Sequence, residues 1–79
     1  MKWKKRIRVI ERGERRVHVY YPGEEGGDVR YSCRRLTERG RLGGTIWVGL
    51  MTWDRFLEVM EEWRRKEERG LVTIEVDEK

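Results

Sequence analysis

The chain has very little of the chemistry that most enzymes and metal proteins use. Its 79 residues include one cysteine, one histidine and one serine, and no asparagine, glutamine or alanine. A single cysteine excludes an internal disulfide, and with a single histidine it disfavours a metal site. Neither Gly26-Gly27 nor Gly43-Gly44 is followed by the Lys-Ser/Thr of a phosphate-binding loop, so no cofactor is expected.

Long apolar segments are also missing. No run approaches the ~20 apolar residues of a membrane span, and the basic N-terminus lacks the apolar core of a secretory signal. We therefore expect a cytoplasmic protein with no membrane partner.

Charged and aromatic residues are abundant. The chain is 43% charged and 37% hydrophobic, and its four Trp, three Tyr and one Phe argue against disorder. Residues 1–44 carry 13 Lys/Arg against 6 Asp/Glu, which favours an acidic polymer as partner. The 14 Arg against 5 Lys, with no amide side chains, fit a hyperthermophile. The length predicts one domain over residues 1–79.

Alternating apolar and polar residues predict strands, and a 3.6-residue period predicts one helix at 53–69, capped by Thr52 and ended by Gly70. The expected strands are 3–12, 15–21, 29–36, 45–50 and 71–76. The predicted fold class is α+β: an antiparallel four- to five-stranded sheet with one long helix packed on one face. The apolar stripe of the helix is expected to be Trp53, Phe56, Leu57, Met60 and Trp63.

The alternation divides the predicted strands into two faces. We expect the core face to hold Ile7, Val9, Val17, Val19, Val29, Tyr31, Cys33, Ile46, Val48 and Leu50. The opposite face is expected to be solvated and to hold Lys4, Arg6, Arg8, Arg16, His18, Tyr20, Arg30, Ser32, Arg34 and Trp47.

The second face, without Ser32, is the predicted binding site, because arginines can neutralise phosphates and exposed rings can stack on bases. The expected function is sequence-tolerant binding of single-stranded nucleic acid, DNA rather than RNA. An RNA-binding module, or an interaction module that docks an acidic partner, is the alternative. For Tyr21, Tyr31 and Arg64, both ligand contact and simple packing stay open.

Catalysis is not expected from this sequence. Cys33 and His18 have opposite parity on their predicted strands, which argues against a nucleophile–base pair. The carboxylates show no spacing that suggests acid–base chemistry. We therefore predict no catalytic residue.

The Arg-rich strands, Tyr20, Trp47 and the helix beginning Thr52-Trp53-Asp54 resemble the ThermoDBP-related archaeal single-stranded-DNA-binding proteins. The resemblance covers the order of elements and no diagnostic motif. It implies a basic, aromatic-lined cleft and self-association of the domain. Four strands followed by a helix are also similar to the single-stranded-DNA-binding transcriptional coactivators, although the strand expected at 71–76 departs from their pattern.

Self-association is also expected from the residues themselves. The predicted core is small, and the edge strand expected at 71–76 is free to pair with another chain. We therefore expect a homo-oligomer, with a dimer favoured over a monomer.

Overall fold

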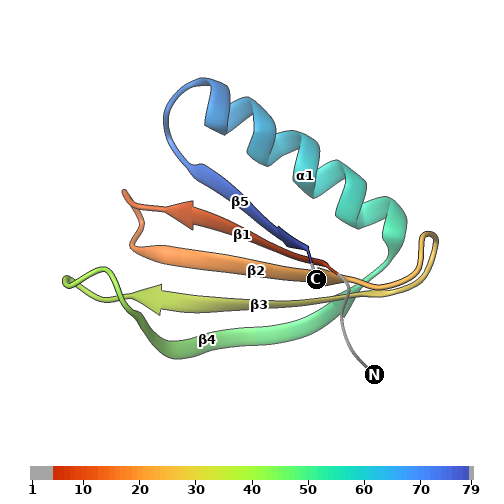
Figure 1. The fold of residues 1–79 in the computed structure, drawn as a ribbon, viewed down its shortest axis with the longest axis horizontal. Coiled ribbons are helices and arrows are strands. Elements are labelled where there is room, and N and C mark those ends of the chain that lie inside the picture. The colour runs from red at the N-terminus through yellow and green to blue at the C-terminus, as the bar shows by residue number, and fades with distance from the viewer. Residues whose placement is uncertain (1–4, 79) are drawn as a thin grey trace.

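A computed structural model describes residues 5–78 as one five-stranded antiparallel sheet with a single helix (Figure 1). The elements, in chain order, are β1 (Lys5–Glu11), β2 (Arg16–Pro22), β3 (Val29–Leu36), β4 (Leu42–Met51), α1 (Trp53–Glu68) and β5 (Thr73–Glu78). The predicted α+β class is confirmed. The sheet order is β4-β3-β2-β1-β5, so β2 is the central strand and β4 and β5 are the edges.

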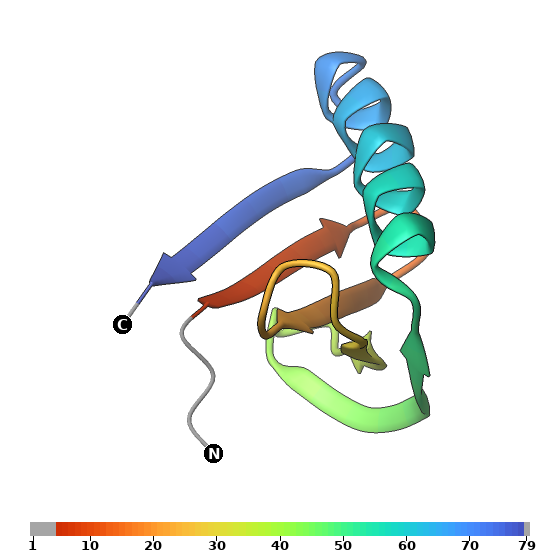
Figure 2. The ribbon, with the colours of Figure 1, turned by 90° about the vertical axis from the view of Figure 1, so that its right-hand side faces the viewer.

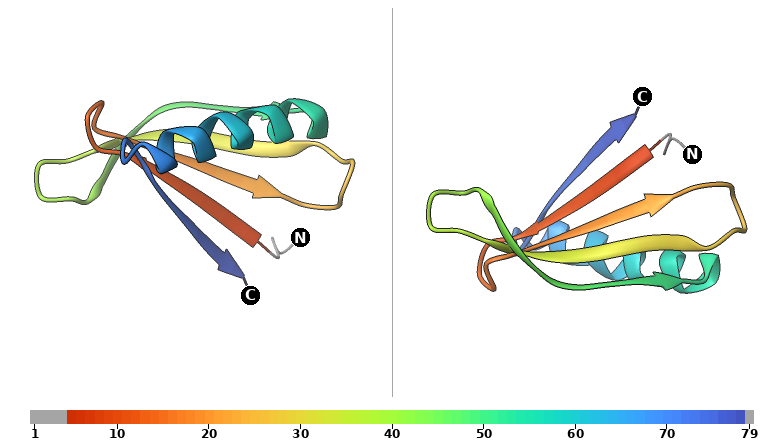
Figure 3. Two further views of the ribbon diagram at one scale, coloured as in Figure 1. Left: turned by 90° about the horizontal axis from the view of Figure 1, so that it is seen from above. Right: turned by 90° about the horizontal axis from the view of Figure 1, so that it is seen from below.

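The helix lies on one face of a twisted sheet whose strands fan out from the end that holds the β1–β2 and β3–β4 turns (Figures 2 and 3). We call the face covered by α1 the helix side and the other face the open side. β4 leads directly into α1, so the first turns of the helix begin beside the β3–β4 edge of the sheet (Figure 2).

The helix ends are determined by local sequence. The Thr52 side chain caps α1 by accepting a hydrogen bond from the Arg55 backbone N–H at 3.2 Å. The chain leaves the helix at Gly70, whose φ of 76° is readily adopted only by glycine. The predicted boundaries of 53–69 are therefore correct to within one residue.

The core lies between α1 and the sheet. Phe56 and Met60 of α1 pack in one cluster with Ile7 and Val9 of β1, Tyr20 of β2, Val29 of β3 and Val72 of the connection to β5. Trp53, Val59 and Trp63 are partly buried against this cluster. Leu57, which the helical period placed in the stripe, is exposed.

The register corrects the predicted face of β2. Tyr20 lies opposite Ile7 on β1 and Tyr31 on β3, and facing residues of antiparallel strands point to the same side. Tyr20 therefore points to the helix side, as do His18 and Arg16. The prediction that these three residues share a solvated face with Arg6 and Arg8 is wrong.

The predicted core valines of β2 are buried, but on the open side. Val17 and Val19 are 2% and 4% exposed, although no helix covers them. Their cross-strand neighbours are Ile10, Arg8, Arg34 and Ser32. Arginine stems can cover apolar surface while their charged ends reach water, and the Arg8 Nε atom is itself buried. Because β2 is buried on both sides, its apolar parity does not indicate where the helix packs.

The face of β4 also differs from the prediction, because β4 carries a bulge. Trp47 pairs with Cys33 and Thr45 pairs with Arg34, which leaves Ile46 as an extra residue. Trp47 therefore points to the helix side with Cys33. Val48 and Leu50, which were expected in the core, lie exposed on the open side.

Truncating the buried helix residue should destabilise the fold far more than truncating its exposed neighbour. We expect Phe56→Ala to lower the free energy of unfolding by about 3–5 kcal/mol, because it leaves a cavity between α1 and the sheet. Leu57→Ala is the matched control and should cost less than about 0.5 kcal/mol. Urea denaturation followed by circular dichroism measures both; equal losses would mean that the helix packs in a different rotation.

Candidate functional site

The predicted site residues divide between the two sides of the sheet. Arg6, Arg8, Arg30 and Arg34 lie on the open side, as expected. The register places the other four of the described set, Arg16, His18, Tyr20 and Trp47, on the helix side. Lys4 lies outside the described residues. The predicted basic and aromatic residues therefore do not form a single face of the sheet.

Acidic residues of β5 neutralise two of the open-side arginines. Arg6 Nη2 lies 2.6 Å from Asp77 Oδ2, and Arg8 Nη2 lies 3.0 Å from Glu75 Oε1. These contacts exist because β5 pairs with β1 in a register that sets Arg6 opposite Asp77 and Arg8 opposite Glu75. Both arginines are thus less available to an external anion.

The other two open-side arginines differ from each other. Arg34 donates from Nε and Nη2 to the Gly43 carbonyl oxygen at 3.2 and 3.0 Å, so its guanidinium helps to hold the start of β4. Arg30 is exposed and forms no ion pair with any residue in the 5–78 range. A hollow of about 370 Å³ beside Arg30 and Arg34 is also lined by Tyr21.

On the helix side, the part of the sheet that α1 leaves uncovered forms a hollow of about 650 Å³, which we call the aromatic cleft. One wall is the sheet, with His18, Tyr20, Tyr31 and Trp47. The other wall is the start of the helix, with Thr52, Arg55 and Val59, and Met51 lies between the two. The cleft brings together rings from three strands and a cation from the helix.

Tyr20 forms the floor of the cleft rather than a free stacking surface. It is buried, and its hydroxyl oxygen accepts a hydrogen bond from Trp63 Nε1 at 2.8 Å. Its ring centroid lies 6.0 Å from that of Phe56 and 6.5 Å from that of Tyr31. Burial raises the pKa of the Tyr20 hydroxyl to about 12, an effect that the Trp63 hydrogen bond partly offsets. Tyr20 is therefore a structural residue.

Trp47 is the ring that is available in the cleft. Its side chain is 40% exposed, and its ring lies 6.3 Å from His18 and 5.7 Å from the Arg16 guanidinium carbon. Tyr31 is partly exposed and lies against Gly49, where an added Cβ would approach the Tyr31 hydroxyl to 3.0 Å. Gly49 thus gives the Tyr31 ring its place on the cleft wall, because a glycine in a strand lets another group approach the backbone closely.

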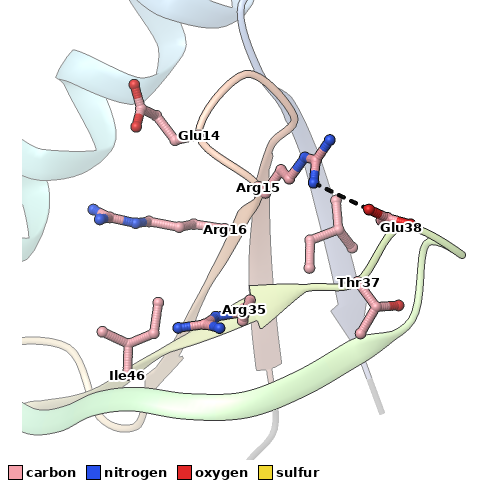
Figure 4. Close-up of a pocket in the computed structure, with 8 residues that line it drawn as sticks. Glu14, Arg15, Arg16, Arg35, Thr37, Glu38 and Ile46 are labelled. Atoms are coloured by element: carbon pink, nitrogen blue, oxygen red, sulfur yellow. Dashed lines mark ion pairs between the residues drawn. The ribbon is translucent and has the colours of Figure 1, made fainter.

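A second hollow, of about 420 Å³, lies on the helix side at the end of the sheet that holds the β1–β2 and β3–β4 turns (Figure 4). It is lined by Arg15, Arg16 and Arg35, and we call it the arginine hollow. Arg15 Nη1 lies 3.8 Å from Glu38 Oε1, whereas the Arg16 and Arg35 side chains extend together away from that pair (Figure 4). Glu14 also lines the hollow, so three arginines face two glutamates.

Arg16 and Arg35 are direct cross-strand neighbours with no carboxylate in ion-pair distance among the residues described. Glu11 lies opposite Arg16 but directs its carboxylate to His18, with Oε1 3.0 Å from Nε2. Like charges directly opposite each other destabilise a sheet. A bound anion would relieve that repulsion. Because Arg16 also lies over Trp47, the arginine hollow and the aromatic cleft adjoin.

The side-by-side position of His18 and Cys33 corrects another prediction. They are cross-strand partners and point to the same side, not to opposite sides. No hydrogen bond joins them; His18 instead bonds to Glu11, and its ring centroid lies 4.7 Å from that of Trp63 with the two rings tilted by 41°. Cys33 is fully buried, and burial raises the pKa of its thiol, which disfavours the reactive thiolate. The absence of catalysis stays a prediction.

The described residues lack the features of two other classes of protein, those that bind metal ions through side-chain clusters and those that cross a membrane with a helix. Across residues 5–78 no three His, Cys, Asp or Glu side chains are grouped closely enough to hold a metal ion. Within the same range, α1 is too short and too polar to cross a membrane.

No protein-family model, curated protein or solved structure matches this chain. The function of the cleft is therefore inferred from its own side chains.

Sequence reasoning missed two residues that the fold brings to the site, Arg35 and Arg55. Arg35 shares the parity of Cys33 on β3, so the alternation does not place it on the predicted solvated face. Arg55 follows the capped start of α1 and forms an ion pair with Glu58, 3.3 Å away. The run Arg34-Arg35 was the available signal, since adjacent strand residues must face opposite sides and one arginine had to lie on each.

The raised pKa of Tyr20 predicts a specific loss of stability in alkali. Above about pH 10 the unfolded chain releases the Tyr20 proton while the folded protein keeps it, so the free energy of unfolding falls as pH rises. We expect this residue to contribute a loss of about 2 kcal/mol between about pH 9 and about pH 11.5.

Tyr20→Phe isolates this effect. The variant is expected to be less stable at neutral pH, because the Trp63 N–H loses its acceptor, and to lose less stability in alkali than the wild type. Urea denaturation at each pH measures the difference between the two proteins. Parallel pH profiles would show that Tyr20 titrates as an exposed tyrosine.

Proposed function

We propose that this protein binds single-stranded nucleic acid on the helix side of its sheet, with phosphates at the arginine hollow and bases in the aromatic cleft. The observation that carries the proposal is the unneutralised pair Arg16 and Arg35 directly beside the exposed ring of Trp47. Cations and an accessible ring within one nucleotide's reach suit a ligand that offers phosphates and unstacked bases together.

The electrostatic part of the proposal rests on which arginines lack internal partners. Arg6 and Arg8 on the open side form ion pairs with Asp77 and Glu75, whereas within residues 5–78 Arg16 and Arg35 form no such contacts. Free guanidinium groups that neutralise phosphates release the cations condensed on the nucleic acid, which provides affinity that weakens steeply with salt. The arginine hollow is therefore favoured over the face that the sequence predicted.

The stacking part rests on the shape of the aromatic cleft. Trp47 and Tyr31 present rings from two neighbouring strands, and α1 closes the opposite wall. An unpaired base can enter such a hollow, while a base inside a duplex cannot. Stacking tolerates every base, so we propose binding with little sequence preference. This agrees with what the ThermoDBP-related resemblance implies, and that resemblance stays a prediction.

Titration with competitors separates the related ligands. Fluorescently labelled oligo-dT is the probe, with duplex DNA, oligo-U and heparin as competitors. The proposal expects oligo-dT to bind more tightly than duplex DNA of equal length, and the oligo-U arm measures the expected preference for DNA over RNA. If heparin competes as well as unlabelled oligo-dT, the arginines bind any polyanion, and docking of an acidic protein becomes the better interpretation.

Removing the exposed ring should weaken binding without unfolding the protein. We expect Trp47→Ala to raise the Kd for labelled oligo-dT on the order of 5- to 150-fold, which corresponds to roughly 1–3 kcal/mol of stacking. Fluorescence anisotropy measures the Kd. Trp47→Phe should retain much of the affinity, and Leu42→Ala, at a residue of the same strand that is 41% exposed, should retain all of it. An unchanged Kd in Trp47→Ala would exclude the cleft as the base site.

Two arginine variants distinguish the helix side from the open side. Arg35→Gln removes a cation of the arginine hollow, and we expect the slope of log affinity against log salt to become shallower by about 0.7, the value for one phosphate of a single strand. Arg6→Gln removes an arginine already paired with Asp77 and should leave the slope unchanged. The reverse pattern would place the strand on the open side.

A further inference from the structure

The two edges of the sheet differ sharply in charge. β5 carries Glu75 and Asp77, and charged side chains on an edge strand oppose pairing with another strand. β4, at the other edge, contains no charged residue and no proline in its ten residues. Figure 3 shows β4 along the outer border of the sheet. Such an edge is an available template for strand addition.

Exposed apolar side chains are concentrated on the same edge. The described chain has eight large hydrophobic residues that are exposed, and five of them belong to β4: Leu42, Ile46, Trp47, Val48 and Leu50. Val48 and Leu50 are the most exposed of all, at 62% and 67%. Apolar side chains gathered in one place mark an interaction surface, whereas scattered ones do not.

We propose that β4 pairs antiparallel with β4 of a second copy of this chain, about a two-fold axis at Gly49, so that two sheets become one of ten strands. An uncharged strand suits self-pairing, because a two-fold axis brings each side chain near its own kind and no like charges meet. Because β4 itself has no charged residue, it offers no ion pair to a charged peptide.

The position of the axis follows from the bulges. Trp47–Met51 pairs with β3 without interruption, whereas the register shifts twice in the first half of β4. A second strand can add only to a regular segment, and Gly49 is the centre of that segment. In this arrangement Val48 contacts the partner's Leu50 on the open side. Trp47 lies beside the partner's Met51 on the helix side.

The pairing would also complete the binding site, a consequence that rests on the function proposed above. Met51 lines the aromatic cleft, so the two clefts would meet across the axis and each would gain a wall from the other copy. One single strand could then run through both clefts. The strand pairing itself does not depend on this function.

Sedimentation velocity in the absence of nucleic acid tests the pairing. The wild-type chain of 9.7 kDa is expected to sediment at twice that mass at micromolar concentration. Val48→Lys places a charge on the pairing edge and should halve the sedimenting mass. Val76→Lys, at a half-exposed residue of β5, is the matched control and should leave the dimer intact. Circular dichroism verifies that both variants fold.

Three outcomes would overturn the proposal: a monomeric wild type, a dimeric Val48→Lys variant, or dissociation by Val76→Lys in place of Val48→Lys. A folded monomeric wild type would assign the β4 edge to a strand from a different protein. Because no oligonucleotide is present, failure of the dimer is distinguishable from failure of nucleic-acid binding, which the oligo-dT titration measures separately.

Discussion

Burial of the central strand on both of its sides is the constraint from which the rest of the structure follows. Tyr20 lies beneath α1 and accepts the Trp63 N–H, while Val17 and Val19 are covered on the open side. Since side chains alternate along a strand, placing Tyr20 under the helix places His18 and Arg16 there as well. A slip of one residue would move Tyr20 to the open side and leave the Trp63 N–H without its acceptor, so the register is strongly determined.

The elements could be predicted from the sequence, but the faces of two strands could not. Thr52 and Gly70 identify the ends of α1, and alternation identifies the strands, because both signals are local. The face of β2 is a tertiary property: arginine stems from β1 and β3 cover its valines, and a single-strand pattern contains no trace of them. The bulge at Ile46 likewise shifts the phase of β4 without an unusual residue at that position.

The location of positive charge available to a ligand depends on strand order, which sequence alone did not provide. The sequence does not show that β5 pairs with β1. Because it does, Glu75 and Asp77 align with Arg8 and Arg6 and neutralise part of the open side, which has the arginines that the sequence pattern favoured. Among the described residues Arg16 and Arg35 have no acidic neighbour of this kind, since Glu11 is turned to His18. The candidate site could therefore be predicted by residue type, but its side could not.

The bulge at Ile46 links the two surfaces that we infer to be functional. It directs Trp47 into the aromatic cleft and, in the next residues, restores a regular strand whose outer edge is unpaired in the described chain. Within that strand Gly49 belongs to both surfaces. The Tyr31 ring occupies the volume where a side chain of residue 49 would be, and a two-fold neighbour could approach the backbone closely there. Because the ring site and the edge are only two residues apart, a change in strand pairing at β4 must alter the cleft. Binding and self-association are thus expected to be coupled through the backbone from Trp47 to Met51.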